Sequence, residues 1–149
     1  RAMTARLMLA LLAPLLLGGF GPFLIFPGGE LSGSASEPPD SWAFTDAIAT
    51  IQLETRPADP YSVNIWITRV DAAIYVHAGA NRATWVEHIE ADPDVRVQIG
   101  EQIFSLRATR VRDAEEFARF SDAYEKKYDR RPRNENVAEV YLFRLTPRE

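Results

Sequence analysis

A long uncharged, apolar run near the N-terminus constrains the architecture of this chain more than any other feature of its sequence. The run extends from Leu7 to Phe26, contains no charged residue and is rich in leucine in its first half. Twenty residues in an α-helix span about 30 Å, which matches the hydrocarbon thickness of a bilayer. We therefore predict a transmembrane anchor over residues 1–27, with the rest of the chain folded beside the membrane.

The charges on either side of this run predict its orientation. Arg1 and Arg6 precede it, and the chain that follows contains only acidic charges as far as Arg56. By the positive-inside rule, the N-terminus of a single-pass protein with this pattern stays in the cytoplasm. The folded part is then extracytoplasmic, in a periplasm where one exists, and membrane lipid is a partner of the chain.

Two alternatives remain open for this segment. Pro14 and Pro22 remove backbone donors and glycines lie between them, so residues 18–27 either complete the span or re-enter the membrane. The leucine-rich half also matches the apolar region of a cleaved signal peptide, although small residues suited to cleavage come only at 34–36. Residues 28–39 are rich in Gly, Ser and Pro and are predicted to be a linker.

Composition excludes several classes of function. The chain has no cysteine, which rules out disulfides, thiolate metal sites and cysteine nucleophiles. Its net charge is −4 and it carries no basic stripe, so no nucleic-acid partner is predicted. The two histidines, His77 and His88, lie on different predicted elements with no third donor nearby, so no metal site is predicted. Arg130, Arg131 and Arg133 form either a solvated loop or a site for an anionic group.

Residues 40–149 are predicted to form one domain of short strands and helices. Alternation of apolar and polar residues marks the strands, and the Asp113 and Glu116 pair is a capping box for the longest helix. Strands are predicted at residues 51–55, 62–70, 73–78, 95–99, 103–111 and 140–145. Helices are predicted after residue 41 and at 83–91 and 114–128. Six strands linked largely by hairpins predict a closed or partly closed antiparallel barrel, because closure removes exposed strand edges.

The stretch from Ile74 to Arg112 carries a resemblance to a known family. In order, it contains a strand, a loop, a Trp-bearing helix, an Ala-Asp-Pro turn, a glycine turn and a strand with Arg-Ala. The matching positions are Trp85, Ile89, 91–93, Val95, Val97, Gly100, 107–108 and Val111. This set resembles the split-barrel proteins that bind flavin or deazaflavin, which include pyridoxamine-phosphate oxidase-like proteins and deazaflavin-dependent nitroreductases. The resemblance implies a mainly β (α+β) fold, a six-stranded split β-barrel with short helices.

The resemblance also implies candidate cofactor-binding residues. In the flavin-phosphate branch a lysine at the start of the short helix grips the phosphate, whereas this chain has Trp85 there, as the deazaflavin branch does. Asn81 and Arg82 precede that helix N-terminus, where free N–H groups favour an anion, unless Asn81 only supports the turn and Arg82 is solvated. His77 lies beside the loop at Gly79, and Trp66 lies on the strand that borders the ligand groove in split barrels. The alternatives are a hydrogen-bonded histidine inside the barrel for His77, and core packing or a dimer interface for Trp66.

Two functions follow from these features. The first is a membrane-anchored split-barrel protein that binds a flavin, a deazaflavin or another planar ligand, with oxidoreductase activity if it is an enzyme. The alternative is a cofactor-free accessory subunit of a larger membrane complex, favoured by Trp85 and by the extracytoplasmic placement, far from reduced nicotinamide. Split barrels commonly pair with the ligand between subunits, so a homodimer is the expectation. No catalytic residue is predicted.

Overall fold

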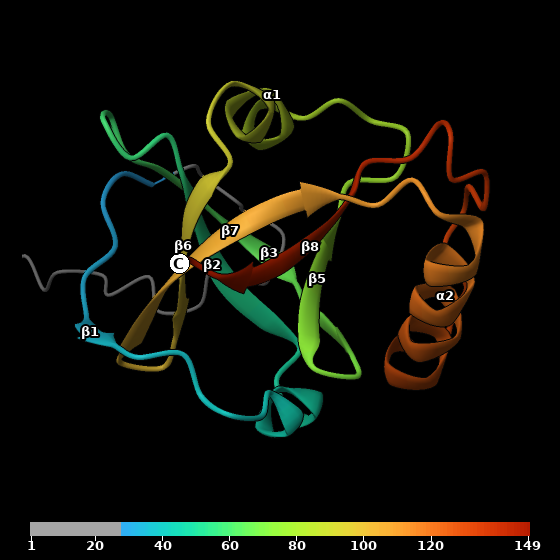
Figure 1. Cartoon of the computed structure of the whole chain (residues 1–149), viewed down its shortest axis with the longest axis horizontal. Coiled ribbons are helices and arrows are strands. Elements are labelled where there is room, and N and C mark those ends of the chain that lie inside the picture. The colour runs from blue at the N-terminus through green and yellow to red at the C-terminus, as the bar shows by residue number, and fades with distance from the viewer. Residues whose placement is uncertain (1–27) are drawn as a thin grey trace, which may run out of the picture.

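The computed structural model describes residues 28–149, which form one curled sheet with a helix at each of two sides (Figure 1). The strands are β1 (Ser34–Ser36), β2 (Thr50–Thr55), β3 (Tyr61–Trp66), β4 (Thr68–Val70), β5 (Ala73–His77), β6 (Asp94–Ile99), β7 (Gln102–Arg110) and β8 (Leu142–Pro147). The helices are η1 (Ala43–Ala47), α1 (Thr84–Ala91) and α2 (Ala114–Tyr128). Within this part of the chain, no helix is long and apolar enough to cross a membrane. The predicted anchor lies outside the described residues.

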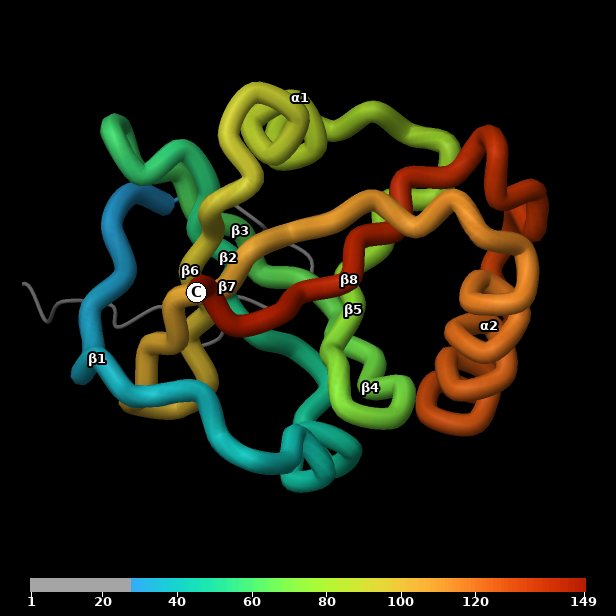
Figure 2. The backbone as a smooth tube through the Cα atoms, viewed as in Figure 1, coloured from blue at the N-terminus to red at the C-terminus, as the bar shows by residue number. Residues whose placement is uncertain are grey.

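The strand order explains why the sheet curls. The order is β3-β2-β6-β7-β8-β5-β4, and each neighbouring pair is antiparallel. β3 and β4 stand at opposite ends of this order, yet only Ile67 separates them in the chain. The two ends of the sheet are therefore brought together, as the tube in Figure 2 shows. The predicted mainly β, split-barrel-like fold is confirmed.

Two local expectations need correction. The predicted strand 62–70 is divided at Ile67, because its first half pairs with β2 and its second half with β5, and the backbone must bend between the two partners. The helix expected after residue 41 is the short 3₁₀ helix η1. There the hydroxyl of Thr45 donates to the carbonyl of Trp42 at 2.6 Å.

Two strands differ from the predicted set. β1 lies within the segment expected to be a linker, and it runs parallel to β7, pairing Ser34 with Gln102. The last strand begins at Leu142 rather than at Val140, because the backbone N–H of Val140 is used within a turn, donating to the carbonyl of Asn136 at 3.2 Å. The sheet thus contains the six predicted strands, one of them divided, and one strand that was not predicted.

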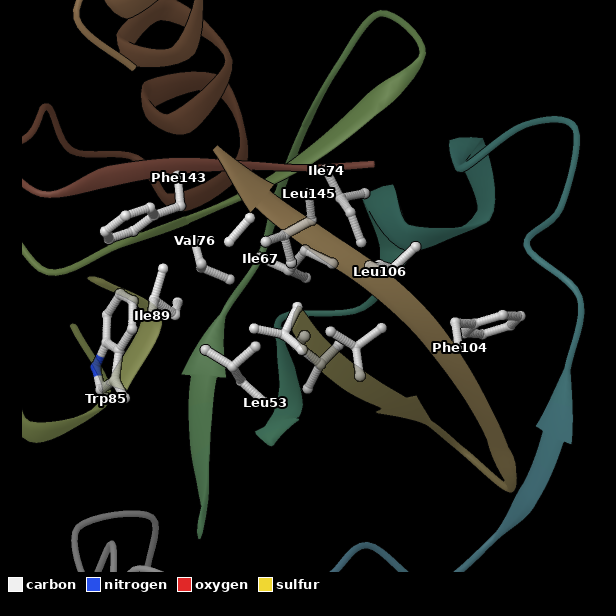
Figure 3. Close-up of a cluster of buried hydrophobic side chains, with 14 of the residues drawn as sticks. Leu53, Ile67, Ile74, Val76, Trp85, Ile89, Phe104, Leu106, Phe143 and Leu145 are labelled. Atoms are coloured by element: carbon white, nitrogen blue, oxygen red, sulfur yellow. The ribbon is translucent and has the colours of Figure 1, made fainter. Parts of the chain in front are cut away.

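Two apolar clusters hold these elements together. The larger one fills the inside of the curled sheet and is covered by α1, from which Trp85 and Ile89 reach inward (Figure 3). The smaller one lies between α2 and the outer side of the sheet. Its buried members are Tyr75, Val111, Phe117, Phe120, Val140 and Leu142. Every member of both clusters removes apolar surface from water, which is the main stabilising term of such a fold.

Local signals delimit α2 at both ends. The Asp113 carboxylate accepts the backbone N–H of Glu116 at 2.8 Å, which confirms one half of the predicted capping box. The other half is not formed, because the Glu116 carboxylate accepts from Tyr75 and Arg144 instead. The helix ends where Asp129 adopts a left-handed conformation with φ 56°. Phe117, Phe120 and Tyr124 lie on one stripe that faces the sheet, so α2 is held against the β4 and β5 side of the fold. This places the aromatic residues of α2 next to the end of β5.

Candidate functional site

The structure separates the predicted site residues into two groups. Trp66 and His77 lie against the aromatic side of α2, whereas Asn81, Arg82 and Trp85 lie at the start of α1. The two groups are joined by the chain itself, because β5 ends at His77 and the loop to α1 follows directly.

Trp66, Tyr124 and Tyr128 form an open aromatic surface at the last turns of α2. The Trp66 and Tyr128 rings are stacked, with centroids 4.1 Å apart and planes 8° apart. Tyr124 lies 6.0 Å from Trp66, and the guanidinium of Arg130 stands 5.9 Å above the Trp66 ring. Trp66 is 42% exposed, and only Phe44, at 44%, is comparable among large apolar side chains of residues 28–149. This surface can stack a flat ring, and Arg130 favours a ligand that carries negative charge.

His77 places a polar atom beside this surface. Its ring lies 5.3 Å from Phe120 and 6.0 Å from Tyr124, between the sheet and α2. Burial lowers the pKa of His77 to about 4, so the imidazole is neutral at pH 7. Its buried Nε2 has no hydrogen-bond partner among residues 28–149. A neutral ring nitrogen can donate or accept, depending on the tautomer, so Nε2 is a buried polar atom with one unmet hydrogen bond.

Acidification is expected to destabilise the fold through His77. The unfolded chain takes up a proton near pH 6.5, whereas the folded chain takes it up only near pH 4. Stability therefore falls as the pH is lowered through this window, by about 3 kcal/mol in total. Urea unfolding of wild type and His77→Leu between pH 7 and 4 measures this effect. Both proteins contain the same carboxylates, so the difference between their curves of stability against pH reports on His77 alone. Parallel curves would contradict the prediction.

The loop before α1 holds the second group. The backbone of Asn81 supports the turn, accepting from Ala83 N at 2.9 Å and donating to the Ala78 carbonyl at 3.3 Å. Arg82 is exposed and pairs with Glu90 of α1 at 2.6 Å. The N-cap residue of the helix is Ala83, whose methyl side chain cannot cap the first amides. An anion at this end would thus meet uncapped N–H groups and one arginine already paired with a carboxylate.

Trp85 differs from the other candidates because it is part of the core. It is nearly buried, and its ring packs edge-on against Phe143 with centroids 5.8 Å apart. Figure 3 shows the ring directed toward Ile89 and Phe143. Its position at the start of α1 therefore serves packing between helix and sheet.

The structure adds residues that sequence reasoning did not assign to a site. Tyr128 was not singled out, although its spacing of four from Tyr124 on a helix could have indicated a shared face.

Near α1, the pKa of Glu90 is lowered first by the hydrogen bond from Arg82 and further by the charges of Arg110 and Arg112. Arg110 also lies 4.4 Å above the Tyr141 ring. Of these three arginines, only Arg82 bonds Glu90 directly. Within residues 28–149 no three His, Asp or Glu side chains are grouped to hold a metal ion.

Comparison with known proteins identifies related folds and one family. The sequence model of the family described as F420H(2)-dependent quinone reductase matches residues 62–137, just over half of the chain. The aromatic surface, His77 and the loop before α1 all lie inside this match. No curated protein matches the sequence.

Several solved structures share the fold at low identity. HutZ, the heme storage protein from Vibrio cholerae, is 19% identical, with a TM-score of 0.56 over 71% of this chain and 86% of that chain. The conserved hypothetical protein Rv2991 from Mycobacterium tuberculosis is 18% identical, with a TM-score of 0.57 over 71% and 77%. A FAD-binding protein from Mesorhizobium loti is 18% identical, with a TM-score of 0.51 over 70% and 82%.

Proposed function

The chain belongs to the family of F420H(2)-dependent quinone reductases, and on this premise we propose that it binds a deazaflavin or flavin cofactor and reduces a quinone-type acceptor. The observation that carries the proposal is the open Trp66 ring, stacked on Tyr128 within the segment that matches the family. Both the cofactor ring and a quinone are flat and aromatic, so the same kind of surface suits either.

The aromatic surface fits the ring of such a cofactor. Stacking of a flat heterocycle on one aromatic side chain contributes about 1–3 kcal/mol where it has been measured by alanine substitution. His77 Nε2, buried and without a partner among residues 28–149, can accept or donate the hydrogen bond that a ring carbonyl or ring N–H requires. Arg130, above Trp66, adds a positive charge at the edge of the surface.

The arginines near α1 fit the acidic tail of such a cofactor. Flavin mononucleotide and F420 both carry phosphate, and the N-terminus of a helix with uncapped amides favours an anion. Arg82 is paired with Glu90, and the charges of Arg110 and Arg112 act on the same carboxylate. A phosphate or carboxylate would compete with Glu90 for Arg82, and Arg82 would then hold the tail.

The proposed chemistry divides between the cofactor and the chain. When bound, the reduced cofactor supplies a hydride, and the quinone needs that hydride and one proton to become a hydroquinone. Trp66 would orient the flat ring that stacks on it and exclude water from that face of the ring. Burial raises the pKa of the Tyr124 phenol, so it stays protonated at neutral pH and can donate a hydrogen bond to a quinone oxygen. His77 stays neutral at pH 7 and would bring no charge to the ring bound nearby.

Truncation of the stacking side chain tests the proposal. Trp66→Ala is expected to weaken binding of flavin mononucleotide or F420 by about tenfold, because it removes the exposed ring on which the ligand stacks. Calorimetric titration of the full chain with each cofactor gives the affinities. Phe44→Ala is the matched control, because Phe44 is equally exposed but lies outside the matched segment.

Two results would count against this function. Equal affinity of Trp66→Ala and Phe44→Ala would place the ligand elsewhere. A wild-type chain that is colourless as purified and binds neither cofactor would favour the alternative, a cofactor-free accessory subunit of a membrane complex. Its co-purification with a larger assembly would then be the supporting observation.

A further inference from the structure

Lys127 is an unusual lysine because its ammonium group is turned toward the protein. Nζ donates to the carbonyls of Thr45 at 2.9 Å, Ile48 at 2.7 Å and Ile67 at 2.7 Å. An ammonium has three donors, so all of them are used on backbone oxygens. Burial lowers the pKa of Lys127, while the nearby Asp46 opposes this shift. Lys127 thus links α2 to η1 and to the point where β3 ends and β4 begins.

Tyr128 contacts the same point through its hydroxyl. Its oxygen accepts the backbone N–H of Ile67 at 3.1 Å, and its proton can reach the carbonyls of Ile67 at 2.6 Å and Ala49 at 2.7 Å. A phenol has one proton, so it serves these two carbonyls alternately. Burial raises the pKa of Tyr128 to about 12, which keeps that proton in place.

These bonds converge on the residue that follows Trp66. Ile67 is the break between β3 and β4, where the strand changes partners and regular pairing is interrupted. Its N–H and C=O are satisfied mainly by Lys127 and Tyr128. The Tyr128 ring meanwhile stacks on Trp66 itself. The backbone position and the ring position of Trp66 are therefore both set by the last turn of α2.

We propose that Lys127 and Tyr128 are positioning residues for the ligand-binding surface, holding Trp66 in place through Ile67. This inference rests on the proposed function for what the surface binds, but the positioning itself does not require a ligand. Neither residue need touch the reacting atoms. Both residues act on Trp66 through its peptide bond to Ile67, and Tyr128 also acts through the ring that stacks on Trp66.

Tryptophan fluorescence can test the positioning without any cofactor. The chain has three tryptophans, and Trp42 and Trp85 are buried, so acrylamide reports mainly on Trp66. Lys127→Met and Tyr128→Phe are expected to raise acrylamide quenching, because each removes a bond to Ile67 and so loosens the backbone that carries Trp66. Tyr128→Phe retains the ring and removes only the hydroxyl, so it is the milder variant if Lys127→Met folds poorly. Lys127→Arg is expected to restore quenching toward wild type, because it returns donors to the carbonyls.

Lys126→Met is the matched control for these variants. Lys126 is the neighbouring exposed lysine on α2 and makes no hydrogen bond or ion pair with any residue from 28 to 149. Its replacement is expected to leave quenching and affinity unchanged. Circular dichroism verifies that each variant is folded at the temperature of the measurement.

Affinity for flavin mononucleotide and F420 completes the test. Both positioning variants are expected to bind about tenfold more weakly than wild type, because a displaced Trp66 no longer matches the ligand. Folded Lys127→Met and Tyr128→Phe with wild-type quenching would overturn the inference, even if Trp66→Ala still weakens binding. Absence of binding to wild type would instead overturn the proposed function, and the quenching comparison would still decide the positioning.

Discussion

Replacement of Arg96 by methionine is expected to lower the free energy of unfolding by about 3–5 kcal/mol, because it leaves a buried carboxylate without its charge partner. Glu54, on β2, is only 2% exposed. It accepts two hydrogen bonds from Arg96, at 2.7 and 2.9 Å, and one from the backbone N–H of Leu31 at 2.8 Å. The same carboxylate therefore joins β2, β6 and the segment that precedes β1.

Urea unfolding followed by circular dichroism measures this loss. Arg107→Met is the matched control, because Arg107 lies on the adjacent strand β7 and its pair with Asp94 is exposed and long, at 3.9 Å. That pair is expected to contribute less than about 1 kcal/mol. The double variant Glu54→Leu with Arg96→Met removes both charges and is expected to recover much of the loss. If Arg96→Met and Arg107→Met lower the free energy of unfolding equally, burial adds nothing to the stability that the Glu54–Arg96 pair contributes.

Truncation of Phe120 to alanine is expected to destabilise the protein by about 3–5 kcal/mol, since it leaves a cavity beneath α2. Phe120 is fully buried and contacts rings on both sides of the interface between helix and sheet. Its neighbours are Tyr75 at 6.1 Å, His77 at 5.3 Å, Phe117 at 6.1 Å and Tyr124 at 5.5 Å. Because α2 carries two of the three side chains of the aromatic surface, cofactor affinity is expected to fall together with stability.

Thermal and urea unfolding give the size of this effect. Phe120→Leu is the control that keeps most of the apolar volume and is expected to cost less than about 1.5 kcal/mol. Phe44→Ala removes a phenyl ring from an exposed position instead, and it is expected to have little effect on stability. A loss for Phe120→Ala no larger than that for Phe44→Ala would contradict the role of Phe120 in holding α2.

Elements with strong local signals were predictable from the sequence. Helix α2 begins at the Asp113 cap and carries its aromatic stripe at helical spacing, and both features depend only on residues within a few positions of each other. The strands β6 and β7 alternate apolar and polar residues and are separated by a glycine turn, which is enough to place a hairpin. The ordered residues of this region also carry the resemblance that the family match confirmed.

Features that depend on distant partners were not predictable in this way. β1 has the residues Ser-Ala-Ser, which have no strand pattern, and it exists because β7 offers a free edge beside Gln102. The break at Ile67 interrupts a run that alternates well in the sequence, and it arises because β2 and β5 each pair with one half. Strand pairing is a long-range interaction, so composition within the run carries no information about it.

The candidate site shows the same division. The sequence alone determined that Trp66, His77, Asn81 and Arg82 are of the types that bind planar or anionic ligands, because side-chain chemistry is a local property. Only the tertiary structure decided that Trp85 packs in the core, that Tyr128 stacks on Trp66 and that Lys127 bonds the carbonyl of Ile67. These contacts join segments separated by some sixty residues of chain. The contacts of Lys127 and Tyr128 form because the curled sheet brings its two ends beneath α2, and that of Trp85 forms because α1 covers the inside of the sheet.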